Sequence, residues 1–377
     1  MKHTAKAMVF EGVEIPFAPY HVELPKPLEG EVLVEISFST ICTSDLHSFF
    51  GRRESPCPCI LGHEIMGRVI AVGLGGASDF SGKKIKRGDR ITWSVYAYDH
   101  NDPTALKGYP QKSQNLYKYG HEKFSANNNL NGGFASHCLL EKGTCIYSLP
   151  DKISDKEAAP LNCSHATMVG ALRMAGDVKG KNIAVIGVGM LGLSACAMAR
   201  ENGAANVVAI DLNTERLAKS LQFGANTTID SQKDIKEWAL TVKGLGGLDV
   251  ILDTSGNPTV IENGISLLNI GGSCIIVGAV YSQRNLSIDA ETIVRRILTI
   301  RGLHNYVPED LYIAIRFMLA TKHKYPFESL VSVEYPLEEL DKAFELADKG
   351  QAYRVGIYPT PTNKKKMPIE RSTETSA

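Results

Sequence analysis

The chain has 377 residues, of which 44% are hydrophobic and 22% are charged, which is typical of a globular enzyme. Its 41 basic residues are balanced by 41 acidic residues, so no overall charge attracts it to nucleic acid or to acidic lipid. No apolar run is long enough to cross a bilayer, and the length is sufficient for two domains. We therefore expect a two-domain protein that acts on a small molecule, without nucleic-acid or membrane partners.

The two ends of the chain and its eight cysteines indicate where it works. The first residues, Met1 to Thr4, do not form a secretory signal, and a chain of this length does not need a disulfide framework. We expect reduced thiols and a cytoplasmic protein. Residues 359–377 are rich in Pro, Thr, Lys and Ser without an apolar period, which predicts a disordered tail.

The first part of the chain consists of short strand-like segments interrupted by glycine and proline. Residues 31–37 alternate between apolar and polar side chains, residues 67–73 form a second such stretch, and a third begins at residue 89. This spacing predicts a compact, partly barrel-like β domain.

After about residue 163, strand-like runs alternate with helical periods. We predict strands at 182–186, 206–211, 249–253 and 273–278, and helices at 166–175, 191–202, 214–223 and 258–268. This order indicates an α/β fold with a doubly wound parallel sheet of the Rossmann type. Two later helices and a final strand at 353–358 are expected to return to the first domain. The predicted boundaries are 1–164, 165–302 and 303–358.

Three residues carry the chemistry of an open zinc site. Cys42 and His63 are 21 positions apart and can come from one domain, whereas Cys163 lies where the pattern changes and can reach a cleft between domains. Each alone is more often a buried structural residue. Together, two thiolates and an imidazole form a ligand set of catalytic zinc, with one position left for water or substrate.

Residues beside these ligands are candidate catalytic groups. Asp45 can orient His63 by accepting its second ring N–H, and Ser44 and His47 can pass a proton outward. Glu64 is either a transient fourth ligand or a residue that holds its loop. The simpler interpretation of Ser44 and Asp45 is a turn or a helix cap.

A glycine-rich turn at 187–192 follows a strand-like run and opens a helix. In this fingerprint the first glycine permits a tight turn, the second lets the backbone approach a pyrophosphate, and the third packs the helix against the strand. The predicted cofactor contacts in the turn are Gly187, Gly189, Met190, Leu191 and Gly192.

An acidic residue, Asp211, ends the next predicted strand 19 residues after the turn. It is expected to bind the ribose hydroxyls and to repel a 2′-phosphate, which favours NAD over NADP. Arg216 is close enough to act on a 2′-phosphate instead, and a capping role for Asp211 is the simpler alternative.

Together with Gly88-Asp89-Arg90, these segments resemble the zinc-dependent medium-chain dehydrogenase/reductase family over residues 5–358. Alcohol dehydrogenases are known for this zinc ligand set. The resemblance implies a GroES-like catalytic domain, a Rossmann domain and one catalytic zinc. It also implies a proton relay from Ser44 to His47, with Thr167, Val277 and Gly278 beside the nicotinamide and Arg354 at the pyrophosphate.

The resemblance further implies a homodimer or homotetramer, with the strand at 273–277 as a sheet-edge contact. Residues 93–95, 110–112, 118–122 and 302–306 resemble a branch of alcohol dehydrogenases associated with phosphonate catabolism.

The chain departs from many of these relatives at the four cysteines that hold a second, structural zinc. Asp99, Asp102, Ala105 and Ser113 occupy that spacing and make a poor zinc cage, so we predict one zinc per subunit.

The predicted activity is hydride transfer between NAD and an alcohol or carbonyl compound, with a phosphonate-bearing alcohol as one option. Two alternatives remain: a zinc-free quinone or enone reductase of the same fold, and a non-redox nucleotide-binding protein. The basic residues near 107–121 either attract an anionic substrate group or form a solvated lysine-rich loop, and the loop is the simpler interpretation. These residues are Lys107, Lys112, Lys118 and His121.

Overall fold

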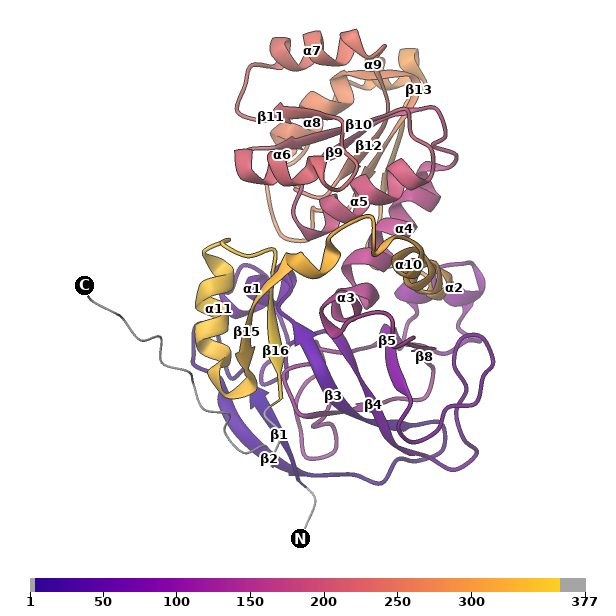
Figure 1. Ribbon diagram of the computed structural model, residues 1–377, viewed down its shortest axis with the longest axis vertical. Helices are drawn as coiled ribbons and strands as arrows, with labels where there is room; N and C mark the ends of the chain where they lie inside the picture. The colour runs from indigo at the N-terminus through magenta and orange to yellow at the C-terminus, as the bar shows by residue number, and fades with distance from the viewer. Residues whose placement is uncertain (1–3, 360–377) are drawn as a thin grey trace, which may run out of the picture.

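A computed structural model describes residues 4–359 and shows two lobes that meet at a narrow waist (Figure 1). The tail predicted at 359–377 lies, apart from its first residue, outside the described residues. No helix in the described range is both long enough and apolar enough to span a bilayer.

The upper lobe of Figure 1 is built on a six-stranded parallel sheet in the order β11-β10-β9-β12-β13-β14. This is the strand order of a doubly wound nucleotide-binding sheet, and it confirms the predicted fold class. The strands are β9 (Asn182–Ile186), β10 (Asn206–Asp211), β11 (Thr227–Asp230), β12 (Leu248–Asp253), β13 (Leu268–Ile276) and β14 (Thr299–Gly302).

Six helices accompany this sheet, and its central strands β9, β10 and β12 are mostly apolar and buried because both faces are covered. Helices α4 and α5 pack on each other and lie toward the waist. The helices are α4 (Ser164–Ala175), α5 (Met190–Glu201), α6 (Thr214–Leu221), α7 (Ile235–Gly244), α8 (Pro258–Ser266) and α9 (Ala290–Arg296).

The lower lobe is mostly β and contains an eight-stranded sheet, in which β7 also pairs with β3 and β8 with β5. A separate antiparallel pair, β1 (Thr4–Val9) and β2 (Ala18–Glu23), lies beside it. The main path is β15 (Val331–Pro336), β16 (Arg354–Tyr358), β3 (Val32–Thr40), β4 (Glu64–Val72), β5 (Arg90–Ala97) and β6 (Tyr117–Lys118), with β7 (His137–Leu140) and β8 (Thr144–Ser148) attached.

The remaining helices lie between the strands of this lobe or at the waist, and α10, with 14 residues, is the longest of them. They are α1 (Thr43–Phe49), α2 (Pro103–Leu106), α3 (Asp155–Ala158), α10 (Pro308–Thr321) and α11 (Leu340–Asp348), with 3-10 turns at Pro110–Lys112 (η1), Ala159–Asn162 (η2), Phe327–Leu330 (η3) and Leu337–Glu339 (η4).

The chain returns to the lower lobe after the Rossmann sheet. Strand β16 pairs antiparallel with β3, with Gly356 opposite Thr40, so the end of the described chain completes the sheet to which β3 belongs. These paired residues are 316 positions apart in sequence (356 − 40).

The sequence prediction of a sheet edge at 273–277 is wrong. Strand β13 is paired on both sides, with β12 and with β14, and β14 forms the edge. The sequence analysis missed β14 because it is only four residues long and three of them are exposed, which removes the apolar signal of a strand.

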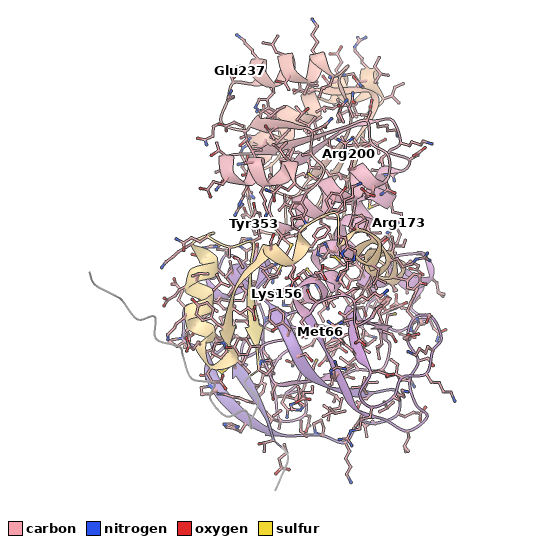
Figure 2. All side chains as sticks on the ribbon, viewed as in Figure 1. Met66, Lys156, Arg173, Arg200, Glu237 and Tyr353 are labelled. Atoms are coloured by element: carbon pink, nitrogen blue, oxygen red, sulfur yellow. The ribbon has the colours of Figure 1, made fainter. Side chains whose placement is uncertain are left out.

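An ion pair joins α4 to α10 at the waist. In Figure 2, Arg173 is labelled at the level where the two lobes meet. Its guanidinium donates two hydrogen bonds, of 2.9 and 3.0 Å, to the carboxylate of Asp310, which is fully buried. The same carboxylate accepts the N–H of Val307 at 3.0 Å and so caps α10.

We expect Asp310→Ala to lower the free energy of unfolding by about 2 kcal/mol, because the cap and the ion pair are both lost. Urea unfolding followed by circular dichroism measures the effect. Asp310→Asn keeps an acceptor for Val307 and should lose roughly half as much. An unchanged midpoint for Asp310→Ala would show that this contact does not stabilise the waist.

Candidate metal centre and nucleotide cleft

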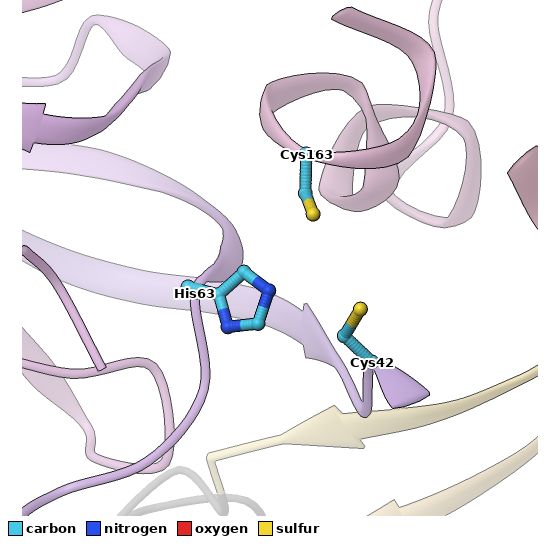
Figure 3. A group of neighbouring side chains, drawn as sticks. All are labelled: Cys42, His63 and Cys163. Carbon is cyan, nitrogen blue, oxygen red and sulfur yellow. The ribbon is translucent and has the colours of Figure 1, made fainter. Parts of the chain in front are cut away.

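Cys42, His63 and Cys163 converge beneath the waist (Figure 3). One ligand atom from each residue lies within 4.8 Å of the other two. Cys42 comes from the residue before α1, His63 from the residue before β4, and Cys163 from the residue before α4. Three segments from distant parts of the chain therefore meet with sulfur and nitrogen donors at one point.

The imidazole of His63 is held by Asp45 on its far side. Nδ1 lies 3.2 Å from Oδ1 of Asp45, although its N–H does not point straight at that oxygen. The same carboxylate accepts the N–H groups of Cys42 at 2.9 Å and Gly62 at 3.1 Å. Asp45 thus fixes the backbone beside two of the converging residues and leaves Nε2 of His63 on the side of the sulfurs.

The charges around this point suit a cation. Burial lowers the pKa of His63, but Asp45 and Cys42 raise it to about 10 overall. The hydrogen bond from Cys163 lowers the pKa of Cys42 well below its usual value, and the same contact raises the pKa of Cys163. A soft, electron-rich donor set with a carboxylate behind the imidazole is the chemistry that zinc requires.

Glu64 and Arg354 form a buried ion pair next to the sulfurs. Arg354 donates from Nε at 2.7 Å and from Nη2 at 2.9 Å to the two oxygens of Glu64, and Nη2 also lies 3.6 Å from Sγ of Cys42. Thr40 and Ser164 donate to the same carboxylate at 2.6 and 2.7 Å. Of the two roles considered for Glu64, these contacts support the one that holds the surrounding segments.

The three converging residues open into a cavity of about 270 Å³ between the lobes. Ser44 lines it, with Oγ 3.3 Å from Nε2 of His63. His47 lines it one helical turn later, and its ring packs against Tyr281 with centroids 4.5 Å apart. Burial, followed by the charges of Arg52 and Arg53, lowers the pKa of His47, so this imidazole is neutral near pH 7.

The glycine-rich turn has the geometry expected of a dinucleotide site. Gly187 has a φ of +80°, which only glycine adopts freely. A Cβ on Gly192 would lie 1.9 Å from the carbonyl oxygen of Gly187, so the helix could not pack there with any larger residue. Gly189 faces open space and precedes the first turn of α5, whose N–H groups are free to meet a phosphate.

A second cavity of about 230 Å³ lies where this turn faces the lower lobe. Gly189 and Met190 line it from above, and Arg216 and Arg354 line it beside Tyr353. Arg216 lies over the Tyr353 ring, 5.8 Å from its centroid, and Figure 2 labels Tyr353 at the waist.

Asp211 ends β10 and accepts the N–H of Val188 at 2.8 Å and that of Asn213 at 2.9 Å. Its carboxylate therefore lies against the glycine-rich turn, and a carboxylate has further lone pairs for sugar hydroxyls.

The structure sorts the predicted site residues into three groups. The first lines the larger cavity: Cys42, Ser44, His47, His63, Cys163, Thr167, Leu191, Val277 and Gly278. The second lines the smaller cavity: Gly189, Met190, Arg216 and Arg354. The third lines neither and supports the others: Asp45, Glu64, Gly187, Gly192 and Asp211.

Several residues of the larger cavity were missed by the sequence analysis. Arg53, Thr254 and Tyr281 line it from loops that have no apolar period and no recognised motif. His304 also lines it, although the sequence gave it only as part of a resemblance. Only the approach of the two lobes brings these side chains together.

The segment at 99–113, which is expected to lack a structural zinc, is held by hydrogen bonds to the backbone. Asp102 accepts the N–H groups of Thr104, Ala105 and Gln114 at 2.7, 3.2 and 3.0 Å, and so caps α2 and ties it to the next loop. Ser113 donates to the carbonyl of Pro110 at 2.9 Å. One zinc per subunit stays a prediction.

Comparison with known proteins identifies the same two domains and the same kind of enzyme. The model of the alcohol dehydrogenase GroES-like domain matches residues 28–151, and that of the zinc-binding dehydrogenase domain matches residues 190–320. An alcohol dehydrogenase of Geobacillus stearothermophilus is 30% identical over 350 residues, covering 92% of this chain and 97% of the relative. A D-arabitol-phosphate dehydrogenase of Enterococcus avium is 29% identical, covering 90% and 93%.

The crystal structure of an alcohol dehydrogenase from Thermotoga maritima superposes with a TM-score of 0.89 at 28% identity, covering 95% of this chain and all of that chain. The fold, the family models and the relatives agree. The chain belongs to the zinc-dependent alcohol dehydrogenase family of medium-chain dehydrogenases/reductases and is an oxidoreductase that acts on CH–OH groups.

Proposed function

We propose that the protein is an NAD-dependent alcohol dehydrogenase with one catalytic zinc, which interconverts a small alcohol and its carbonyl compound. The observation that carries the proposal is the convergence of Cys42, His63 and Cys163 on a cavity that also reaches the glycine-rich side of the Rossmann sheet. These three residues would hold the zinc. A zinc-free reductase or a non-redox nucleotide-binding protein has no use for this donor set.

When bound, zinc supplies a Lewis acid for the substrate oxygen and NAD supplies the hydride acceptor. The chain's own residues hold the geometry. Asp45 keeps His63 in one orientation, and the Glu64–Arg354 pair keeps the backbone at Cys42 and Cys163 in place. Thr167 donates its hydroxyl to the carbonyl of Cys163 at 2.6 Å and lines the cavity opposite Val277.

Ser44 is the first proton carrier that we propose, because its hydroxyl lies 3.3 Å from Nε2 of His63 and faces the cavity. His47 is the last carrier, because it lines the same cavity and its Nδ1 has no hydrogen-bond partner among the described residues. Its lowered pKa keeps the imidazole free to accept a proton near neutral pH.

The cofactor preference is proposed from Asp211. Its carboxylate is anchored by two backbone N–H groups at the end of β10, where a ribose would lie, and its charge disfavours a 2′-phosphate. Arg216 is engaged with the Tyr353 ring, which supports NAD rather than NADP.

A phosphonate-bearing alcohol is one proposed substrate. It follows from the branch that residues 118–122 and 302–306 resemble. The D-arabitol-phosphate dehydrogenase among the relatives adds that a protein similar along its length is named for an anionic substrate.

We further propose a cytoplasmic homodimer or homotetramer. All eight cysteines lie in the described chain and none forms a disulfide, which suits a reducing compartment. The edge strand β14 is exposed, and Val294 and Ile297 beside it are 76% and 70% exposed.

Sedimentation of the wild-type protein should show a dimer or tetramer, and Val294→Glu should shift the protein toward a smaller species. A wild-type monomer would contradict the proposal.

Removal of one sulfur ligand tests the metal site. We expect Cys42→Ser and Cys163→Ser to lose bound zinc and at least about a thousandfold in kcat/KM, because the Lewis acid is lost. NAD affinity, measured by fluorescence titration, should stay within about twofold because the nucleotide fold is intact.

The exposed cysteine Cys57, which lines neither cavity, is the matched control. Cys57→Ser should keep both zinc and activity. Normal turnover by a preparation that a chelator has freed of zinc would overturn the proposal.

Exchange of the acidic residue at the end of β10 tests the cofactor preference. We expect Asp211→Ser to lower kcat/KM for NAD by about ten- to hundredfold, because hydrogen bonds to a charged group are lost, and to improve NADP relative to NAD. Asp230 ends the neighbouring strand, and Asp230→Ser is the control. An unchanged NAD to NADP ratio in Asp211→Ser would remove Asp211 from this role.

A further inference from the structure

The cavity of about 270 Å³ above the metal centre opens into an outer cavity of about 1080 Å³. The polar residues that line this outer cavity are mainly basic. We name this region the basic vestibule, and its members are Arg53, Lys112, Lys118, His121 and His304. Arg53, Lys118, His121 and His304 also line the inner cavity, so the vestibule is continuous with the proposed reaction site. The chain is neutral overall, and the accumulation is therefore local.

The cations of the vestibule have no acidic partner, unlike Arg90, Arg173 and Arg354, whose guanidinium groups pair with carboxylates. Among the described residues, Arg53, Lys112 and Lys118 form no ion pair. By contrast, Arg52 lines the same cavity and is paired with Asp348 at 2.7 Å. Three basic side chains without an ion pair thus line one cavity.

The acidic residues nearest to the vestibule offset only part of this charge. Glu54 lines the cavity and, like Lys112, is exposed, and it forms no ion pair within the described chain. Glu122 accepts the backbone N–H of Lys118 at 2.9 Å and makes no ion pair with the ammonium of Lys118 within the described chain. A fourth cation, Arg52, is already neutralised.

Several hydrogen-bond donors of these side chains have no acceptor within the described chain. Arg53 donates from Nη2 to Ser48 at 2.9 Å, to the carbonyl of Ser44 at 3.2 Å and toward His121 at 3.5 Å. Its Nε and Nη1, and the ammonium of Lys118, have no hydrogen-bond partner in the described chain. Lys112 donates to Nδ1 of His304 at 2.7 Å, which ties the lower lobe to the upper one across the vestibule.

Crowding of like charges in a half-buried place is unfavourable unless an anion is bound there. Burial, and then the charges of Arg53 and Lys112, lower the pKa of Lys118 to about 8. This lysine is therefore not the fully solvated side chain that the sequence pattern suggested as the simpler interpretation.

The vestibule is separate from the place proposed for the cofactor phosphates. The smaller cavity beside Gly189 and Met190 contains Arg52, but the five members of the vestibule do not line it. An anion in the vestibule would be at the substrate end of the cleft, next to Tyr281 and Leu303, rather than at the glycine-rich turn.

We propose that the basic vestibule is an anion-binding subsite, and that the enzyme acts on short alcohols or carbonyl compounds with a phosphonate or phosphate group at the end away from the reacting carbon. This inference rests on the proposed dehydrogenase function. Basic side chains from the loop after α1, from η1 and from β6 line the cavity, and a dianion there would be attracted by all three.

The spacer between the two ends of the substrate must be short. The ring of His121 lies 5.4 Å from that of His63, and Nη2 of Arg53 lies 3.5 Å from the far nitrogen of His121. A single imidazole thus separates a proposed metal ligand from the first cation of the vestibule.

The first experiment compares three hydroxylated substrates whose terminal groups carry different charges. The zinc-loaded enzyme with NAD is given 2-hydroxyethylphosphonate, its neutral dimethyl ester and 3-hydroxypropanoate. We expect kcat/KM for the phosphonate to exceed that for the ester by about a hundredfold, with the carboxylate between them, and the advantage to shrink as salt is added. Equal values for the phosphonate and the ester would overturn the inference.

The second experiment measures binding without turnover. Calorimetric titration with methylphosphonate should show binding to the wild-type holoenzyme that is weakened about tenfold in Lys118→Met and further in the double variant with Lys112→Met. Lys107 is exposed in the same lobe and lines neither cavity, so Lys107→Met is the matched control and should bind as the wild type does. Equal binding by wild type and double variant would overturn the inference.

The two proposals fail in different ways. If the enzyme with zinc and NAD bound oxidises no alcohol of any charge, the dehydrogenase proposal fails, and methylphosphonate binding still decides whether the vestibule binds anions. If neutral alcohols are oxidised as well as their phosphonate counterparts, the dehydrogenase proposal stands and the anion subsite is rejected.

Discussion

The buried pair of Glu64 and Arg354 is the interaction on which the candidate site depends. It joins the start of β4 to the start of β16, 290 positions later, and both side chains are almost wholly out of contact with water. Bulk water does not reach the pair, so its charged groups must find hydrogen-bond partners within the protein. Thr40 and Ser164 donate the remaining hydrogen bonds to the carboxylate. Removal of one partner from such a pair typically costs about 3–5 kcal/mol because the other charge is left buried.

This network also explains why three distant donors converge. Each of the three proposed metal ligands lies one or two residues from a member of the network: Cys42 follows Thr40, His63 precedes Glu64, and Cys163 precedes Ser164. The carboxylate of Glu64 therefore fixes three backbone segments at once, and Asp45 fixes two of them again through the N–H groups of Cys42 and Gly62. The metal would bind to positions that hydrogen bonds have already set, which limits the reorganisation that binding requires.

The parts of the molecule that the sequence predicted are those with a local or chemical signal. The Rossmann strands are buried on both faces and appear as apolar runs, and a glycine-rich turn between such a run and a helix has few other uses. The cysteine and histidine donors were predicted mainly from the family resemblance, because each of them alone is more often a buried structural residue. Strands β2 and β14 were missed because they are mostly exposed, so tertiary pairing rather than an apolar period defines them.

The charge of the cleft was the property least accessible from sequence. The sequence indicated Lys112, Lys118 and His121 as basic residues of one region, but not that Arg53 lines the same cavity. Arg53 comes from the loop after α1, and His304 comes from the loop between β14 and α10. The position of these side chains between the lobes limits their contact with water, which strengthens both repulsion among cations and attraction to an anion. Tyr281 packs against His47 in the same cleft, so the proposed proton carrier and the proposed anion subsite share one cavity lining.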